Sequence, residues 1–333
     1  MEGPDGLSLP VWRFARRAMG TRFEIALVEP DGLRAESFAE AALDEVERVE
    51  AQLSVYRYTS EVSGLNHLAH AGPVQLEPSL FNLLDRCRMI SAATGGAFDP
   101  CVGPMIRAWG FVEGSGALPD PERLRQAAES SGFRHVVLDG ESRTVRFDHA
   151  GCEVNLGAVG KGHAVDLAMA ILEDDGAGDY LIHGGTSTLG ARGSDPGNSA
   201  GDGWRVSLRA PTPEDPDPGC VILSNSCLSV SAPHGRSFKL GGRRYGHVID
   251  PRTGQPQTSG RLAAVVHPSA MLTDALSTAL LVLGIEGTAM LEREFPGCEW
   301  LYLDSEGTLN RSAGWPSTSV RRPETETSSG ERA

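Results

Sequence analysis

Residues 154–166 read V-N-L-G-A-V-G-K-G-H-A-V-D, and the interpretation of the whole chain starts from this stretch. It opens on a strand-like pair, Val154 and Leu156, passes through three glycines and enters a helical pattern at 163–172. Glycine lets the backbone approach a bound group closely. The start of a helix presents unpaired N–H groups and the positive end of its dipole, and Lys161 adds a full charge beside them. This strand, turn and helix therefore favour a binding place for an anion, most plausibly a phosphate.

The glycine spacing excludes two common phosphate-binding motifs. Lys161 is followed by Gly162 instead of Ser or Thr, so the stretch is not a Walker loop. The letters G-A-V-G-K-G also do not follow the G-x-G-x-x-G pattern of a dinucleotide-binding turn. A tight strand-to-helix turn with an exposed lysine is the alternative interpretation.

Composition and charge exclude several classes of partner. Hydrophobic residues make up 40% and charged residues 22% of the 333 residues, which is ordinary for a globular protein with a packed core. The formal net charge of −14 argues against nucleic acid or an anionic membrane surface as the main partner, because both require a basic footprint. An anionic cofactor therefore requires a local positive patch or a metal ion.

The cysteines and apolar runs predict neither a disulfide framework nor a membrane anchor. The six cysteines show no C-x-x-C pair and no zinc spacing, so we expect scattered reduced thiols. The apolar run around 280–284 is too short to cross a bilayer. The first twenty residues lack the apolar segment of a signal peptide, which predicts a cytoplasmic protein unless a leader was removed.

Hydrophobic periodicity predicts helices early in the chain and interspersed strands and helices later. The helices are expected at 32–53, 79–93, 163–172, 273–284 and 286–295. The strands are expected at 22–28, 135–138, 144–147, 180–182, 204–209, 227–231, 237–240, 262–267 and 300–303. Because strict βαβ alternation is missing, this order favours an α+β architecture over a doubly wound sheet.

We expect one large domain at 11–311, with a loose lead-in at 1–10 and a tail at 312–333. From Ser312 onward the composition shifts to Ser, Thr, Pro, Glu and Arg without apolar periodicity. Such a segment cannot bury enough apolar surface to order itself, so the tail is predicted to be disordered.

The stretch T-D-A-L-S-T-A-L at 273–280 carries the sharpest polar cluster outside the glycine-rich turn. On a helix, Asp274, Ser277 and Thr278 fall at i, i+3 and i+4 and share one face. One carboxylate with hydroxyl oxygens suits magnesium, which keeps waters and takes its other ligands from substrate phosphates. The alternative is a helix cap, in which Thr273 or Asp274 holds the helix start.

Three further positions are candidates whose residue types allow two interpretations. His247 precedes the turn D-P-R-T-G and has the neutral pKa range of a general base, although such a turn is also a structural unit. The sequence Ala97-Phe98-Asp99 offers an aromatic face and a carboxylate for a ring system, or core packing plus a cap. Tyr56 is either a stacking platform or a half-buried residue at a helix end.

Taken in order, these stretches resemble the ApbE family, the FAD:protein FMN transferases. The resemblance runs from Met19 to about Gly284 and rests on motifs in a common order. They are M-G-T at 19–21, L-S-V-Y and S-E-V-S-G-L-N within 53–66, T-G-G-A-F-D-P at 94–100, N-L-G-A-V-G-K-G-H-A-V-D at 155–166, G-G-T at 184–186, G-H-V-I-D-P-R-T-G at 246–254 and T-D-A-L-S-T-A-L at 273–280.

The resemblance implies both a fold and an activity. The fold would be a single large α+β domain related to the T-fold, with mixed sheets flanked by helices and a cofactor cleft between two lobes. The activity would be Mg²⁺-dependent cleavage of the FAD pyrophosphate. FMN would be joined through its phosphate to a Thr or Ser hydroxyl of an acceptor protein, and AMP would be released. A dinucleotide pyrophosphate carries about two negative charges, which an acidic protein can hold only where a cation and donors converge.

Position by position, the resemblance also implies roles for individual residues. Contacts to FAD fall on Met19, Tyr56, Ala97, Phe98, Asp99, Asn155, Lys161 and Val248. The metal ligands would be the Ala158 carbonyl, Asp274 and the hydroxyls of Ser277 and Thr278. His247 matches a position proposed as the base that takes the proton from the acceptor hydroxyl, and together with Asp274 it is expected to be catalytic.

The chain departs from the family pattern in three places. Asn155 stands where many members have Asp, so hydrogen bonding is kept and a charge is lost. Members that modify exported proteins often carry a secretion or lipoprotein signal, and none is seen here. S-A-P-H at 231–234 replaces the T-S-G-type turn expected ahead of the His247 motif, which changes the expected wall toward the acceptor.

Two other functions fit the same residues. An FAD pyrophosphatase would use the same metal site with water in place of the acceptor hydroxyl, and a flavin-binding protein would leave FAD intact. The transferase and the pyrophosphatase both depend on one juxtaposition. The carboxyl group of Asp274 must face 157–161, near enough for both to share one ion.

Overall fold

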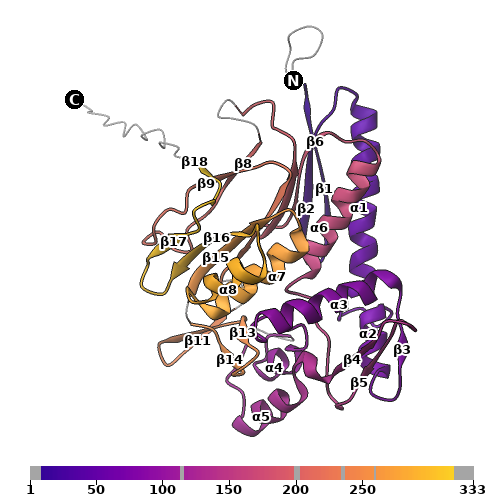
Figure 1. The fold of residues 1–333 in the computed structure, drawn as a ribbon, viewed down its shortest axis with the longest axis vertical. Coiled ribbons are helices and arrows are strands. Elements are labelled where there is room, and N and C mark those ends of the chain that lie inside the picture. Colours follow the sequence, from indigo (N-terminus) through magenta and orange to yellow (C-terminus); the bar gives the residue numbers. More distant parts are fainter. Residues whose placement is uncertain (1–8, 113–115, 199–202, 234–236, 259, 319–333) are drawn as a thin grey trace, which may run out of the picture.

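The computed structural model describes residues 9–112, 116–198, 203–233, 237–258 and 260–318, and its centre is one antiparallel sheet (Figure 1). Within these residues the sheet has eight strands in the order β1-β2-β6-β7-β10-β15-β16-β17. The strands are β1 (Val11–Ala18), β2 (Thr21–Val28), β6 (Asp179–Gly184), β7 (Thr188–Arg192), β10 (Ser226–Ser231), β15 (Gly260–His267), β16 (Glu299–Asp304) and β17 (Leu309–Arg311).

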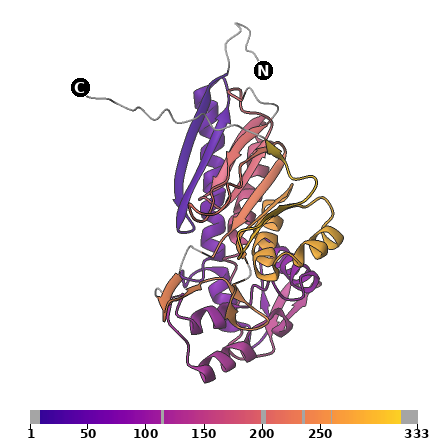
Figure 2. The ribbon, with the colours of Figure 1, turned by 90° about the vertical axis from the view of Figure 1, so that its left-hand side faces the viewer.

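Helices cover one face of this sheet and enclose the main hydrophobic core (Figures 1 and 2). They are α1 (Gly32–Leu53), α6 (Gly160–Asp174), α7 (Ala270–Leu283) and α8 (Gly287–Glu294). In α1 the apolar side chains recur at helical spacing, so that Phe38, Val46 and Val49 are buried on one face. Its first turn is capped by Asp31, whose carboxylate accepts a hydrogen bond from Leu33 N at 2.9 Å.

A smaller sheet covers the opposite face. It consists of β18 (Ser317–Thr318), β9 (Cys220–Leu223) and β8 (Trp204–Ser207). Trp204 and Trp315 pack there in a second hydrophobic cluster that includes Leu262 of β15 and Leu301 of β16. Because the central strands are buried on both faces, β15 is apolar at nearly every position instead of alternating.

A second lobe lies beside the lower end of the sheet in Figure 1. Its helices are α2 (Glu61–Leu68), α3 (Pro78–Ala93), α4 (Gly103–Ala108) and α5 (Pro121–Ser130). Its strands are β3 (Val74–Gln75), β5 (Thr144–Phe147) and β4 (Val136–Asp139) in one sheet, and the hairpins β11 (Ser237–Leu240) with β12 (Arg243–Gly246) and β13 (Ile249–Asp250) with β14 (Gln255–Pro256). The mixed helices and sheets confirm the predicted α+β class.

Helices α6 and α7 approach each other closely because residue 162 has no side chain. A Cβ atom at Gly162 would lie 2.2 Å from the Ala270 carbonyl oxygen. Asp166, one turn further along α6, caps α7 through hydrogen bonds from Met271 N at 3.0 Å and Ser269 Oγ at 2.8 Å. The glycine-rich stretch therefore positions α7 directly, through both its missing side chain and its carboxylate.

Several predictions about local structure were wrong. Val154 and Leu156 are buried as expected but lie outside any strand, because the side-chain amide of Asn66 pairs with both the N–H and the carbonyl of Val154 (2.8 and 2.9 Å). Strands β1, β7 and β9 and helix α5 were not predicted. Helix α7 begins at Ala270 and not at Thr273.

The predicted start of the disordered tail at Ser312 was also wrong. Ser312 accepts a hydrogen bond from Trp300 N at 3.0 Å, Trp315 is buried, and Ser317–Thr318 pairs with β9. The buried tryptophan, the hydrogen bond and the strand pairing together order a segment whose composition is otherwise polar. The lead-in at 1–8 and the tail from 319 lie outside the described residues.

The cysteines and the helices agree with the sequence expectations. All six cysteines are free thiols, and all except Cys220 are buried. In the described part of the chain, no helix combines the length and the apolar character needed to cross a membrane.

Candidate active site

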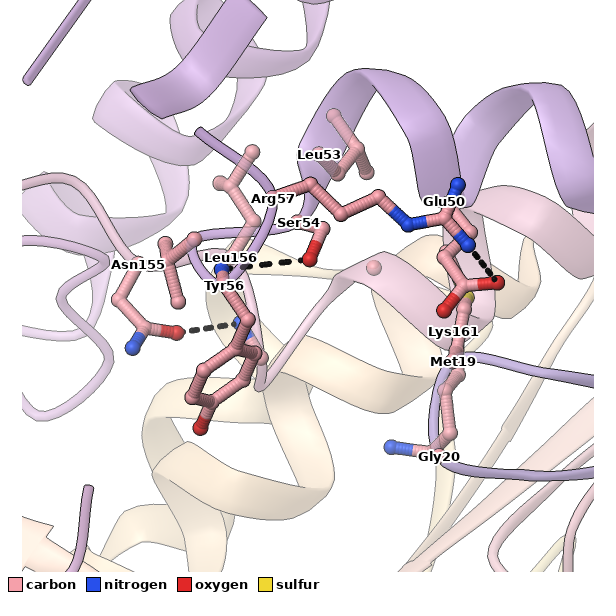
Figure 3. A pocket seen from close by; sticks show the side chains of 13 residues that line it. Met19, Gly20, Glu50, Leu53, Ser54, Tyr56, Arg57, Asn155, Leu156 and Lys161 are labelled. Carbon is pink, nitrogen blue, oxygen red and sulfur yellow. Dashed lines mark hydrogen bonds and ion pairs between the residues drawn. The ribbon is translucent and has the colours of Figure 1, made fainter. Parts of the chain in front are cut away.

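A cleft of about 430 Å³ opens beside the start of α6 (Figure 3). Its walls are the β1–β2 turn (Met19, Gly20), the end of α1 (Glu50, Leu53), the loop 54–57, the stretch 155–157, and Gly160 and Lys161 of α6. This volume lies within the range of about 300–1,000 Å³ found for small-molecule sites. Among the residues expected to contact a cofactor, Met19, Tyr56, Asn155 and Lys161 line it.

The floor of the cleft is shaped by the Asn155 side chain. Asn155 Oδ1 accepts a hydrogen bond from Gly157 N at 2.9 Å, which closes a turn over its own backbone. Asn155 N donates to the Pro100 carbonyl at 2.6 Å, so the same residue is tied to the second lobe. An Asp at this position would accept the same hydrogen bond, so the amide preserves the turn while removing a charge.

Met19 forms the tight end of the β1–β2 hairpin at the cleft wall. Its φ is 52° and that of Gly20 is 70°, the pair of positive values that a two-residue type I′ turn requires. A methionine is rarely found in this conformation. The hairpin register, with Ala18 opposite Thr21, leaves the turn no other residues to use.

Asp274 faces the start of α6 from the neighbouring helix. Its carboxylate is buried, accepts hydrogen bonds from Gly162 N (3.1 Å) and Thr188 Oγ1 (3.3 Å), and lies 4.0 Å from Lys161 Nζ. Burial raises the pKa of the Asp274 carboxyl, and the charge of Lys161 opposes that rise. The juxtaposition on which the functional hypotheses depend is therefore present: residue 274 faces the glycine-rich turn.

The alternative that Thr273 or Asp274 caps the helix is wrong. The cap of α7 is Ser269, whose hydroxyl accepts from Leu272 N at 3.3 Å. Asp274 lies in the second turn, where helix N–H groups are already satisfied within the helix. Its carboxylate is thus directed at α6 and not at its own helix.

Ser277 and Thr278 extend the polar face that begins at Asp274. Their hydroxyls lie 3.1 and 3.2 Å from the Asp274 carbonyl, and both contact Ser231 Oγ of β10 (2.9 and 3.2 Å). Sequence reasoning did not assign Thr188 or Ser231 to this cluster. No local sequence pattern points to either residue. Strands β7 and β10 are far from α7 in the chain, and only the folded sheet brings them to it.

The oxygen atoms around Asp274 fit a hard divalent cation. Gly162 N donates to Asp274 Oδ2 instead of to the Ala158 carbonyl four residues before it, and among the described residues no other hydrogen bond reaches that carbonyl. A carbonyl without a helical partner beside a buried carboxylate is a donor set that magnesium accepts. No group of three or more His, Cys, Asp or Glu side chains in the described part of the chain could hold a metal by itself.

Ala97, Phe98 and Asp99 do not line this cleft. Ala97 and Phe98 are buried, with Phe98 in the main core. The carboxylate of Asp99 accepts hydrogen bonds from Cys101 N at 2.8 Å and Phe133 N at 2.9 Å, and burial raises its pKa. In the described structure Ala97 and Phe98 pack in the interior, and the Asp99 carboxylate joins its own turn to Phe133.

His247 and Val248 lie between the hairpins of the second lobe and are also absent from the described lining of the cleft. His247 is half-buried, and Val248 O accepts a hydrogen bond from Gln257 N at 2.9 Å. The segment is anchored by stacked aromatic rings. The ring centroids of Trp109 and Tyr245 are 5.6 Å apart, and Trp109 Nε1 donates to the Gly254 carbonyl at 2.8 Å.

The arrangement can bind and polarise an anion. The start of α6 supplies the positive end of its dipole, Lys161 supplies a charge, and Asp274 with its oxygen neighbours can hold a cation. A chain whose net charge is −14 thus has, at this one place, the groups needed to hold a diphosphate.

Comparisons with known proteins place the chain beside members of one family. The model of the ApbE family matches residues 19–302. The FAD:protein FMN transferase of Treponema pallidum is 34% identical over 82% of this chain and 80% of its own length. Among solved structures, the apo form of the Pseudomonas stutzeri flavinyl transferase ApbE is similar with a TM-score of 0.81 and 28% identity, covering 92% of this chain and 96% of that chain. The ApbE protein of Thermotoga maritima has the same fold, with a TM-score of 0.82 and 24% identity over 91% of this chain and 97% of that chain.

Proposed function

The chain belongs to the ApbE family, and from this premise we propose that it is a Mg²⁺-dependent FAD:protein FMN transferase. It cleaves the pyrophosphate of FAD, attaches FMN through its phosphate to a Thr or Ser hydroxyl of an acceptor protein and releases AMP. The observation that carries the proposal is the contact of the buried Asp274 carboxylate with Gly162 N and Lys161 at the edge of the cleft.

The diphosphate of FAD is assigned to the start of α6. Lys161 lines the cleft and reaches toward Asp274, so its ammonium lies between the cleft and the Asp274 carboxylate. Gly160 N and Gly162 N already donate to Leu156 O and Asp274 Oδ2, so the positive end of the helix dipole and the Lys161 ammonium are what favour negative charge there. Tyr56, Met19 and Asn155 line the rest of the cleft and are assigned to the flavin or adenine ring. The corresponding assignments of Ala97, Phe98, Asp99 and Val248 rest on the family resemblance alone.

A magnesium ion would be held by the Ala158 carbonyl, Asp274, Ser277 and Thr278. When bound, it would stabilise the negative charge that develops on the phosphates as AMP leaves. Thr188 orients the Asp274 carboxylate through its 3.3 Å hydrogen bond, and Ser231 orients the two hydroxyls of α7. His247 is assigned as the base that takes the proton of the acceptor hydroxyl, a role that the imidazole suits near neutral pH.

One incubation separates the transferase from its alternatives. The full chain is mixed with FAD, Mg²⁺ and a candidate acceptor protein, and the products are denatured and resolved on a gel and by chromatography. Flavin fluorescence that stays with the denatured acceptor, together with AMP, is the expected result. Free FMN with AMP and no labelled acceptor identifies a pyrophosphatase, and intact FAD identifies a flavin-binding protein.

A further inference from the structure

The cleft contains a second cation to which the proposed function gives no role. Arg57 lines it together with Lys161, and Arg57 Nη2 lies 3.2 Å from Glu50 Oε2 at the end of α1. Figure 3 shows the Arg57 side chain extending from the loop toward Glu50, away from the ring of Tyr56. The Arg57 side chain is 50% exposed and that of Glu50 is 21% exposed, so the guanidinium is fixed on one side and open on the other.

The charges in the cleft explain why this pair matters to an anionic ligand. The charged residues of the lining are Glu50, Arg57 and Lys161. Lys161 already faces the Asp274 carboxylate, so its positive charge is shared. The Glu50 carboxylate would repel a diphosphate unless a cation stands beside it. Without Arg57, the charges of the lining and of Asp274 would therefore sum to a net negative value.

The chemistry of the guanidinium allows it to serve both partners at once. Arginine presents five N–H donors in a rigid plane, so one edge can hold Glu50 while another reaches a phosphate oxygen. A half-exposed ion pair contributes little to the free energy of folding, because water screens its charges. The pair is thus better placed to orient a ligand contact than to stabilise the protein.

We propose that Arg57, oriented by Glu50, is a second cationic contact for the diphosphate of FAD. This inference rests on the proposed function of the cleft, and it adds the residue that offsets the charge of Glu50. Arg57 binds the substrate, and Glu50 is a positioning residue.

The test compares binding of FAD and riboflavin to the full chain in EDTA, so that no turnover occurs. Replacing Arg57 by Ala is expected to raise the dissociation constant of FAD about tenfold, because a charge-assisted contact is lost. Riboflavin has no phosphate, so its dissociation constant should stay unchanged. Glu50→Gln should weaken FAD binding less than Arg57→Ala does, because the glutamine oxygen can still accept a hydrogen bond from the guanidinium, and riboflavin binding should again stay unchanged.

Helix α1, which carries Glu50, also carries a matched control pair. Arg48 pairs with Glu45 at 2.6 Å with exposures of 47% and 17%, and neither residue lines the cleft. Arg48→Ala should leave the binding of both ligands unchanged. Thermal melts of each variant verify folding.

The outcomes separate this inference from the proposed function. If the wild type binds no FAD in EDTA and also releases no AMP from FAD when Mg²⁺ is supplied, the proposed function fails. If the wild type binds FAD and Arg57→Ala behaves as Arg48→Ala does, only the role of Arg57 is wrong. An equal loss of riboflavin binding in Arg57→Ala, or a loss of FAD binding in Glu50→Gln as large as in Arg57→Ala, would show a structural clamp and also contradict the inference.

Discussion

At the scale of single residues, the site depends on how Asp274 is satisfied. Its carboxylate is buried, and a buried charge is tolerated only when it is paired and hydrogen-bonded. Gly162 N, Lys161 and Thr188 Oγ1 provide these partners from two separate parts of the chain, α6 and β7. We therefore expect activity to fall both when the Asp274 carboxylate is removed and when a residue that orients this carboxylate is replaced.

Replacing Asp274 by Ala is expected to lower the rate of AMP release at least about a hundredfold, because the charge that would hold the metal ion is removed. Thr188→Val keeps the carboxylate and removes only one hydrogen bond, so the expected loss is about tenfold. AMP is measured by chromatography at several Mg²⁺ concentrations, and circular dichroism verifies the fold. Turnover that is unchanged in Asp274→Ala would remove this residue from the metal site.

Replacing His247 by Ala is expected to lower transfer of FMN about 10²- to 10⁴-fold, the range for a lost general base. FAD binding should remain within about twofold of the wild type, because the described lining of the cleft does not include His247. Transfer is measured by acceptor fluorescence and binding by titration of FAD in EDTA. Loss of FAD binding would instead identify His247 as a substrate contact.

At the scale of elements, the site is produced by the crossing of α6 and α7. Gly162 permits the contact, and Asp166 fixes it by capping α7 through Met271 N and Ser269 Oγ. The residues that bring the helices together thus belong to the same glycine-rich stretch that lines the cleft. Stability and activity are coupled at this contact for that reason.

Gly162→Ala is expected to lower the free energy of unfolding by about 1–3 kcal/mol or more, because its Cβ would lie 2.2 Å from backbone at Ala270. Gly64→Ala is the control within another helix. A Cβ there meets nothing within 4 Å, so this change should raise the free energy of unfolding by about 0.5–1 kcal/mol. Urea unfolding measures both, and equal effects of the two substitutions would contradict the close contact of α6 and α7.

At the scale of the whole molecule, packing of the helical layer buries a titratable group. His163 on α6 is 9% exposed, and within the described residues its Nε2 has no hydrogen-bond partner. Burial, reinforced by the positive charges of Arg86 and Arg48 and opposed by Glu45, lowers the pKa of His163 to about 4. The folded protein therefore favours the neutral imidazole.

This burial predicts a loss of stability in acid. Because the pKa of His163 is about 6.5 when unfolded and about 4 when folded, its contribution is fully present above about pH 6.5. It is lost as the pH falls toward 4, by at most about 3 kcal/mol. His163→Leu should flatten the dependence of the free energy of unfolding on pH between 4 and 6.5, relative to the wild type and to His70→Leu at an exposed position. An unchanged pH dependence would contradict the burial of a neutral His163.

The local patterns of the chain were sufficient for the class of fold and for much of the candidate site. Periodicity identified α1 over its full range, and the glycine-rich stretch with the polar face of 273–280 identified Lys161, Asp274, Ser277 and Thr278. These features could be predicted because helical spacing and turn residues are local properties. The edge strand and the C-terminal segment were harder to predict from the sequence. The exposed strand β1 and the segment around Trp315 carry little apolar periodicity, so their order follows from pairing and packing with distant residues.

The amino-acid order alone thus determined the α+β class, the glycine-rich start of α6 with its lysine, and a carboxylate with hydroxyls on one face of α7. Which of these groups meet was decided by the packed molecule. Asp274 faces Gly162 because α6 and α7 cross without a side chain between them, and Thr188 and Ser231 join the site because the sheet places β7 and β10 against α7. Such contacts depend on residues that are far apart in the chain, and no local pattern records them.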